Sequence, residues 1–155
     1  MAQVIKAPSS LKNGFRIFLS GSVEGKDWRA TLMKKLKNQD IIFLDPRRDD
    51  WDSSWKKSKA DPKFSKQVNW ELNGLEKADV IALYFDKASE SPISLLEFGL
   101  FGRSSKMIVY CSKGFTHKGN VDIVCERYNI EQVDSMDELA KSIVSKYSKT
   151  GKKEK

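Results

Sequence analysis

The chain is poor in the residues that build metal centres and disulfide frameworks. Its 155 residues include one histidine, His117, and two cysteines, Cys111 and Cys125. Both cysteines have apolar sequence neighbours, so we expect two buried free thiols rather than a disulfide or a metal site. A single histidine supplies neither a metal site nor a Ser-His-Asp triad. We therefore predict a protein that uses no metal and no other cofactor.

Long hydrophobic runs are also missing. No stretch approaches the roughly 20 apolar residues of a transmembrane helix, and the first residues lack the apolar core of a signal peptide. We therefore expect an intracellular, cytoplasmic protein without a membrane partner.

A strong excess of one charge sign is absent from most of the chain. The formal net charge is +7, but residues 149–155 (KTGKKEK) contribute +3 of it and leave +4 for the rest. Acidic and basic residues are interspersed along that remainder, which favours a solvated surface over a nucleic-acid-binding face. We therefore do not expect nucleic acid as a partner, and we expect the basic tail to be disordered.

Apolar and amphipathic segments alternate from residue 15 onward. Short apolar runs typical of buried strands occupy 15–20, 40–44, 79–85, 106–111 and 130–133. Apolar residues at helical spacing predict helices over 26–38, 63–77, 92–103, 120–128 and 135–148. This alternation predicts an α/β fold, namely a single-domain three-layer α/β/α sandwich with a flavodoxin- or Rossmann-like parallel sheet of about five strands. The domain is expected to cover 15–148, after a flexible lead-in over 1–14.

The first predicted strand ends in a glycine-containing turn, SGSVEG, over residues 20–25. Ligands of parallel α/β folds bind at the carboxyl ends of strands. Gly21 and Ser22 precede a helix here, and such a turn suits a phosphate group. The spacing matches neither the G-x-G-x-x-G nor the Walker pattern. A tight turn without any ligand contact fits this stretch equally well.

A long loop, DPRRDDWDSSWKKSKAD, covers residues 45–61. Loops of this length in compact domains are usually functional or disordered, and tryptophans argue against disorder. Arg47 and Arg48 suit phosphate oxygens, although pairing with the aspartates of the loop fits equally well. Trp51 and Trp55 suit stacking on a nucleobase, although anchoring of the loop to the body of the domain is slightly favoured.

Glu97 is a carboxylate inside the apolar segment SPISLLEFGLF. Ser91 and Pro92 fit a helix N-cap followed by proline at the first helical position, which places Glu97 in the second turn. Its expected helical neighbours are apolar: Ile93, Leu100 and Phe101. We therefore expect partial desolvation close to the positive end of the helix. A capping box from Ser94 to Glu97, or an exposed glutamate, also fits, and the pattern alone favours these structural roles.

Two further polar residues have ordinary explanations on pattern alone. Glu71 follows Trp70 in a predicted helix and fits an exposed helix glutamate. Asn120, within KGNVDIV, fits the cap of a short helix. Neither pattern by itself indicates a functional site.

Taken in order, five segments resemble the nucleoside 2-deoxyribosyltransferase superfamily over roughly residues 15–133. They are IFLSGS, DPRRDDWDSSW, VNWELNGLEKADVIALYF, SPISLLEFGLF and KGNVDIVCERYNI. The resemblance is greatest to the branch with a D/N-P-R-R-x-x-W loop and a P-I-S-L-L-E-x-G helix. It implies an enzyme that cleaves the N-glycosidic bond of a 2′-deoxyribonucleoside and transfers the sugar to another nucleobase.

The resemblance also implies roles for individual residues. Glu97 matches the nucleophile, which would form a covalent deoxyribosyl-glutamate and preserve the β-anomer over two displacements. Glu71 aligns with an acidic residue that binds the nucleobase and delivers its proton. Asn120 aligns with a residue that reaches the sugar site of a neighbouring subunit, which implies at least a homodimer. The expected substrate-binding residues are Gly21, Ser22, Asp45, Arg47, Trp51, Asp86, Ser91 and Asn120.

Two positions depart from the family pattern. Phe18 stands where the family often has a tyrosine whose hydroxyl orients the nucleophile. Ser91 stands where transferases have an aspartate that contacts the base, and Asp86, Asp49 or Asp50 are candidates to substitute for it. Two alternatives therefore stay open: hydrolysis of a 2′-deoxynucleoside or its 5′-monophosphate, and a nucleotide-sensing module without turnover.

Overall fold

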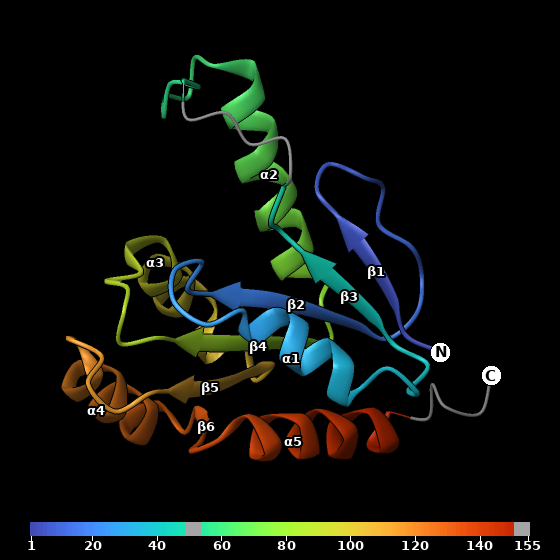
Figure 1. The fold of residues 1–155 in the computed structure, drawn as a ribbon, viewed down its shortest axis with the longest axis vertical. Helices are drawn as coiled ribbons and strands as arrows, with labels where there is room; N and C mark the ends of the chain where they lie inside the picture. The colour runs from blue at the N-terminus through green and yellow to red at the C-terminus, as the bar shows by residue number, and fades with distance from the viewer. Residues whose placement is uncertain (49–53, 151–155) are drawn as a thin grey trace.

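One parallel sheet of six strands forms the centre of the protein (Figure 1). The computed structural model describes residues 1–48 and 54–150, so Asp49, Asp50, Trp51 and most of the basic tail lie outside the described residues. The strands are β1 (Gln3–Lys6), β2 (Arg16–Gly21), β3 (Ile42–Asp45), β4 (Val80–Phe85), β5 (Met107–Cys111) and β6 (Glu131–Val133). They lie in the order β1-β3-β2-β4-β5-β6, and every neighbouring pair is parallel.

Helices cover both faces of the sheet, which confirms the predicted three-layer α/β fold. They are α1 (Trp28–Lys35), α2 (Pro62–Lys77), α3 (Pro92–Phe101), α4 (Lys118–Tyr128) and α5 (Met136–Lys149), with a short 3₁₀ turn, η1 (Gly102–Ser104), after α3. Apolar residues of α1 and α5 form one core with one face of the sheet. Apolar residues of α2, α3 and α4 form a second core with the opposite face. No helix within the described residues is long and apolar enough to cross a bilayer.

The central strand β4 shows why its sequence is apolar at every position. All six of its residues are buried. Val80, Ala82 and Tyr84 belong to the core beneath α1 and α5, whereas Ile81 and Leu83 belong to the opposite core. A strand covered by helices on both faces cannot alternate apolar and polar residues, because neither of its faces meets water.

The first fourteen residues correct one expectation. Rather than a loose lead-in, they include strand β1, which pairs with β3 in the register Val4 to Phe43. Trp70 also anchors this segment, because its indole Nε1 donates a hydrogen bond to the Ser9 carbonyl at 2.8 Å. The strand was not evident in the sequence because it lies at a sheet edge, where only Ile5 of its four residues is buried.

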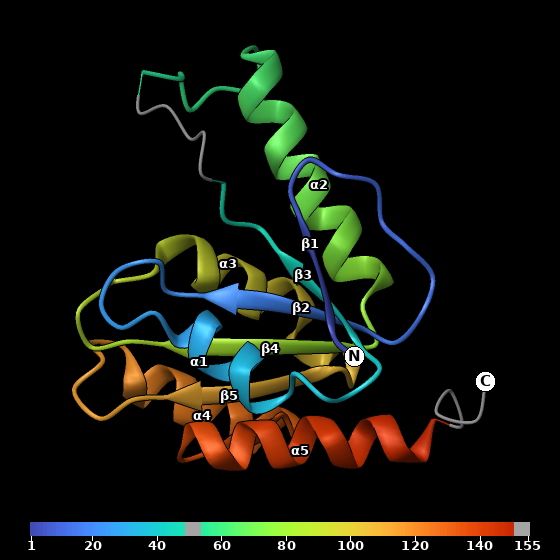
Figure 2. The same cartoon turned by 45° about the vertical axis from the view of Figure 1, so that its right-hand side comes forward.

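The strand order places a topological switch point between β2 and β4. From β2 the chain moves to β3 on one side, and then returns through α2 to β4 on the other side of β2. The loops after β2 and β4 therefore leave the sheet in opposite directions at its carboxyl edge, the place where parallel α/β folds bind their ligands. Helix α2 projects from the sheet with its N-terminal half beyond the body of the domain (Figure 2).

Candidate functional site

The turn after β2 requires a glycine. Gly21 has φ +135°, and a Cβ atom there would lie 2.3 Å from the carbonyl oxygen of Tyr84 on β4. The next residue, Ser22, donates its backbone N–H to that same carbonyl at 3.0 Å. The ends of β2 and β4 approach each other so closely that only glycine fits at position 21. The same close approach brings Ser22 to the switch point.

Glu97 lies inside this edge of the sheet and is only 7 % exposed. Its Oε1 atom accepts a hydrogen bond of 2.7 Å from the hydroxyl of Ser20 on β2. Helix α3 begins after Ser91, as predicted, so Ser94 is not its N-cap and no capping box forms with Glu97. The two structural explanations, a capping box and an exposed glutamate, are therefore both wrong.

The surroundings of Glu97 differ from the expected apolar stripe. Ile93 and Leu100 are 60 % and 59 % exposed, whereas Glu97 shares the inward side of α3 with Ser94 and Phe98. The prediction of an apolar helix face around Glu97 is wrong for these two residues. The helix is apolar almost all round, so the sequence pattern contains no information about which side meets the sheet.

Burial perturbs the ionisation of both candidate catalytic carboxyl groups. It raises the pKa of Glu97 above its ordinary value, while the Ser20 hydroxyl and the positive charge of Arg29 act in the opposite direction. Burial also raises the pKa of Glu71 to about 7, and the negative charge of Glu97 adds to this rise. The two groups are thus electrostatically coupled. Two buried, coupled carboxyl groups with perturbed pKa values are typical of sites of acid–base chemistry.

Arg29 is a functional candidate that sequence reasoning missed. It is 3 % exposed, and its guanidinium donates to the carbonyls of Leu19, Gly21 and Ser22 at 3.0–3.2 Å. Its Nε lies 3.7 Å from the carboxylate of Asp45. Burial lowers the pKa of Arg29 to about 10, so the side chain is still charged at neutral pH.

A signal for Arg29 was present in the sequence. Arg29, Leu32 and Leu36 are spaced as one face of a helix, and both leucines are buried. A cation on an apolar helix face needs buried acceptors, which here are the backbone carbonyls of the turn after β2. Arg29 therefore holds in place the segment that carries Ser20.

A chain of serine hydroxyls joins the two loops at the switch point. The Oγ atoms of Ser22 and Ser91 are 2.6 Å apart, and Ser91 Oγ donates to Ser89 Oγ at 3.1 Å. Ser91 is the N-cap residue of α3, as predicted, and has φ +49°. Its side chain makes no hydrogen bond to the first turn of the helix, so it does not cap the helix as an N-cap serine usually does. The backbone N–H of Asp86 donates to Ser22 Oγ at 2.9 Å.

Asp86 is an ionised carboxylate on the same edge of the sheet. Burial alone would raise its pKa, but hydrogen bonds from the Ala88 N–H, the Tyr84 hydroxyl and the Lys26 N–H hold that pKa below its ordinary value. The structure therefore brings Gly21, Ser22, Asp86, Ser91, Glu97 and Glu71 together at one end of the molecule.

Asp45 and Arg47 lie beside this site rather than within the hydroxyl chain. Asp45 is buried, pairs with Arg29 and accepts the backbone N–H of Arg47 at 3.0 Å. The guanidinium of Arg47 is half-exposed and lies 3.3 Å from the carboxylate of Asp27, the N-cap residue of α1. Among the described residues, the guanidinium of Arg47 thus pairs with an aspartate outside its own loop. Asp45 anchors Arg29, whereas Arg47 lies at the rim.

Asn120 is separate from these residues in one protomer. Helix α4 begins at Lys118 after His117, so the predicted role of Asn120 as the helix cap is wrong. Its side chain is exposed in the first turn of α4. Within the described part of the chain, no hydrogen bond links Asn120 to Glu97, Ser22 or Ser91.

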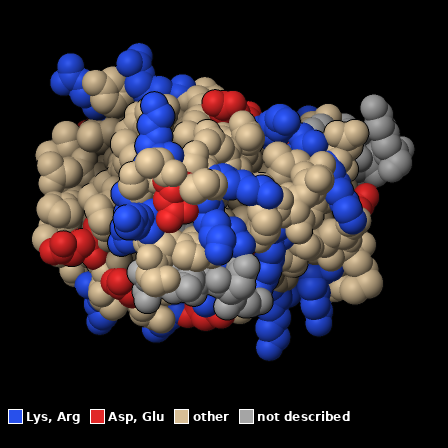
Figure 3. Space-filling model, turned by 90° about the horizontal axis from the view of Figure 1, so that it is seen from above, with Lys and Arg blue, Asp and Glu red and all other residues tan. Residues whose placement is uncertain are grey.

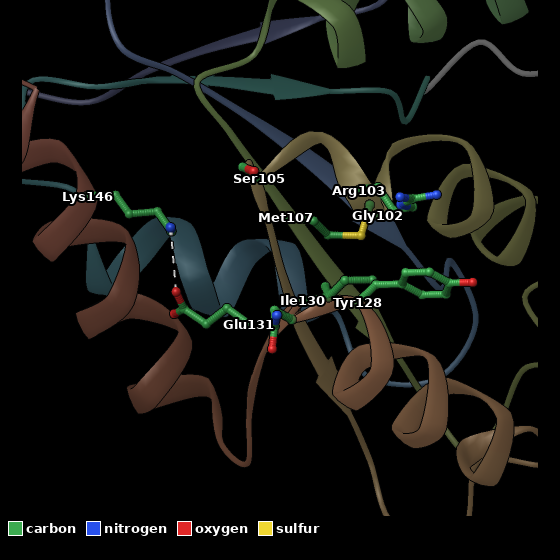
Figure 4. Close-up of a pocket in the computed structure, with 9 residues that line it drawn as sticks. Gly102, Arg103, Ser105, Met107, Tyr128, Ile130, Glu131 and Lys146 are labelled. Atoms are coloured by element: carbon green, nitrogen blue, oxygen red, sulfur yellow. Dashed lines mark ion pairs between the residues drawn. The ribbon is translucent and has the colours of Figure 1, made fainter.

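A cavity of about 380 Å³ lies at the opposite edge of the sheet (Figure 4). Met107 and Glu131, the first residues of β5 and β6, line it together with Arg103, Tyr128 and Lys146. Glu131 pairs there with Lys146 at 3.5 Å. Parallel α/β folds bind their ligands at carboxyl ends, so this cavity at the amino ends is remote from the candidate site.

The described residues carry no cluster of three or more His, Cys, Asp or Glu residues that could hold a metal ion. Cys111 and Cys125 are buried free thiols, as predicted. Lys and Arg side chains are interspersed with carboxylates on the face seen in Figure 3 and do not form one continuous basic patch there.

Comparisons with known proteins indicate the family and the fold of this chain. A family model described as nucleoside 2-deoxyribosyltransferase like matches residues 14–115, which include Glu71 and Glu97. A solved structure, a conserved protein from Enterococcus faecalis V583, is similar with a TM-score of 0.58 and 15 % identity, covering 86 % of this chain and 99 % of that one. That likeness shows a shared fold. A search of curated proteins found no match. On the extent of the family match, the chain belongs to the nucleoside 2-deoxyribosyltransferase-like family.

Proposed function

We propose that this protein cleaves the N-glycosidic bond of 2′-deoxyribonucleosides through Glu97 and transfers the sugar to a second nucleobase. The observation that carries the proposal is the buried Glu97 carboxylate, hydrogen-bonded to Ser20 at the switch point and coupled to a second carboxyl group, Glu71. A carboxylate nucleophile and a carboxylic acid are the two groups that a retaining displacement at a sugar carbon needs.

In the first step, a carboxylate oxygen of Glu97 attacks C1′ of the sugar and the C1′–N bond breaks. The electron pair of that bond passes to the ring nitrogen of the base, which takes the proton of the Glu71 carboxyl group. The products are a deoxyribosyl ester of Glu97, the ionised Glu71 and the free base. A pKa of about 7 keeps Glu71 largely protonated in mildly acidic solution and about half protonated at neutral pH, as this step requires.

In the second step, a ring nitrogen of another base attacks C1′ from the opposite side and releases the Glu97 carboxylate. The proton of the incoming base returns to Glu71, and the β-anomer is restored. Water in place of the base gives free deoxyribose by the same route. The two outcomes differ only in whether the pocket holds a second base while it excludes water.

Hydrolysis of a 2′-deoxynucleoside 5′-monophosphate is the second candidate function, and the serine hydroxyls favour it. Ser91 replaces the expected aspartate, and its hydroxyl lies 2.6 Å from that of Ser22. Uncharged hydroxyls do not repel a phosphate, whereas an aspartate at position 91 would. The ionised Asp86 nearby is unfavourable for phosphate binding, because both groups are negatively charged.

One set of assays tests both candidates. The four 2′-deoxynucleosides and their 5′-monophosphates are each incubated with the protein, with and without a second free base, and the released and exchanged bases are quantified. Intact mass spectrometry after incubation with a 2-deoxy-2-fluoro analogue is expected to show one covalent sugar adduct. Nucleotide binding without adduct, release or exchange would instead indicate a sensing module and would contradict the proposal.

The pH dependence of the reaction is expected to follow Glu71. This residue must donate a proton, and its pKa is raised to about 7, so kcat/KM should fall as the pH rises above 7. Glu71→Gln is expected to remove this basic limb and to lower kcat by roughly 10²–10⁴-fold. The measurement is base release between pH 5 and 9, and an unchanged basic limb in the variant would mean that another group is the acid.

A homodimer formed through α3 is part of the proposal. Leu96, Ile93 and Leu100 form an exposed apolar row on this helix, and Ile123 on α4 is 67 % exposed on the same helix face as Asn120. An exposed apolar row on a helix is typical of an interface between chains. We infer that a second copy packs here and that Asn120 completes the sugar site of the partner.

Leu96→Glu is expected to convert the dimer into a monomer and to reduce activity together with it. A charge placed in an apolar interface has no partner, so association becomes unfavourable. Light scattering after size-exclusion chromatography measures the mass. Val4→Glu, which adds the same charge at an exposed apolar residue of the edge strand β1, is the control. Equal masses for all three proteins would exclude α3 as the interface.

A further inference from the structure

Strand β2 carries the two residues on which this inference rests. Residues 18 and 20 of a strand point to the same face of the sheet. Phe18 is completely buried there, with its ring 6.3 Å from that of Trp70 and packed closely against Gly74 of α2. Its ring packs in the core and has no hydroxyl to offer Glu97. Two residues further along the strand, on the same face, the hydroxyl of Ser20 reaches Glu97 at 2.7 Å.

We propose that Ser20 is the positioning residue of the nucleophile, supplying from position 20 the hydroxyl that Phe18 lacks. This inference rests on the proposed function of Glu97. The Ser20 hydroxyl donates to Oε1, which fixes the carboxylate plane and leaves Oε2 free to attack C1′. The same hydrogen bond favours the ionised carboxylate over the neutral acid in a site that burial makes unfavourable for charge.

The position of the Ser20 hydroxyl is itself determined by rigid neighbours. Ser20 is 1 % exposed and pairs with Leu83 in the register between β2 and β4. The guanidinium of Arg29 donates to the carbonyls of Leu19 and Gly21, on either side of Ser20. The donor therefore cannot move far from Glu97 without disturbing a central strand. Preorganisation of this kind is what a nucleophile needs to attack at a defined angle.

A purely structural role for Ser20 makes different predictions. A buried hydroxyl must find an acceptor, so the bond to Glu97 could merely satisfy Ser20. In that case Ser20→Ala would raise the pKa of Glu97 and change stability, but kcat and KM would stay unchanged at a pH where Glu97 is ionised. A positioning role instead also lowers kcat at that pH, with little change in KM.

The test compares Ser20→Ala with Ser20→Thr, which keeps the hydroxyl. The titration of the Glu97 carboxyl carbon is followed by ¹³C NMR in the free protein, with Glu97→Gln identifying the signal. We expect Glu97 to titrate at a higher pH in the alanine variant than in the wild type. We also expect kcat to fall roughly ten- to a hundredfold, the size of one hydrogen bond to a charged group. The threonine variant should retain most of both properties.

Several outcomes would overturn the inference. One is an alanine variant whose kcat, at a pH where Glu97 is ionised, equals that of the wild type, and another is a folded threonine variant that behaves like the alanine variant. If thermal melting shows that the alanine variant is unfolded, Ser20→Cys takes its place, and its weaker S–H donor should shift both quantities in the same direction. Because the NMR titration needs no substrate, its failure is distinguishable from a failure of the proposed function, which Glu97→Gln tests separately.

Discussion

Glu97→Gln is expected to lower sugar transfer or base release by roughly 10⁴-fold or more in kcat, the scale observed when an enzyme loses its nucleophile. The amide has nearly the shape of the carboxylate but cannot form an ester with C1′. The 2-deoxy-2-fluoro analogue should therefore leave no covalent adduct on the variant. Steady-state assays of base release and intact mass spectrometry measure the two effects independently.

Glu90→Gln is the matched control for this substitution. It makes the same chemical change on an exposed glutamate in the loop that precedes α3, and activity should stay within about twofold of the wild type. The Glu97→Gln protein should also unfold at a temperature equal to or higher than that of the wild type, since it no longer contains a desolvated carboxylate. Full activity in Glu97→Gln would refute the proposed mechanism.

Arg29→Met is expected to have the largest effect on stability, a loss of roughly 3–5 kcal/mol in the free energy of unfolding. The substitution keeps much of the side-chain volume but removes the donors from three backbone carbonyls. It also leaves the carboxylate of Asp45 buried without its cation. Urea denaturation followed by tryptophan fluorescence measures the change. A second effect is a higher pKa for Glu97, because the positive charge of Arg29 now lowers it.

Arg47→Met is the control for Arg29→Met. The ion pair between Arg47 and Asp27 is largely exposed, so its loss should change the free energy of unfolding by less than about 1 kcal/mol.

The higher pKa of Glu97 in the Arg29 variant should move the acid limb of the pH–rate profile to higher pH, since fewer Glu97 groups are ionised at a given pH. A loss of less than 1 kcal/mol in Arg29→Met would show that the guanidinium contacts do not hold the site together.

Periodicity was sufficient to predict the layers of the fold. The run DVIALYF can be buried on both faces only in a sheet covered by helices, and the structure shows this arrangement for β4. Strand β1 could not be predicted in the same way, because an edge strand with one buried residue has no distinctive pattern. The register of its pairing with β3 depends on backbone groups, which every residue carries.

The resemblance to a known family selected Glu97, whereas the sequence pattern alone favoured a structural role and supported the wrong neighbours. A helix that is apolar almost all round has no preferred inward face in its sequence. Contact with β2 turned Glu97 and Phe98 inward and left Ile93 and Leu100 exposed. Arg29 was missed for a related reason. Its acceptors are backbone carbonyls, and their convergence on one guanidinium exists only after the turn is folded.

The sequence by itself determined the alternation of strands and helices and the position of Glu97 early in α3. These follow from local rules of spacing and capping. Only the tertiary structure decided that Ser20 donates to Glu97, that Glu71 lies near enough to be coupled to it and that a buried arginine supports both. Such contacts join residues far apart in the chain, and their pKa values depend on burial, which no local pattern contains.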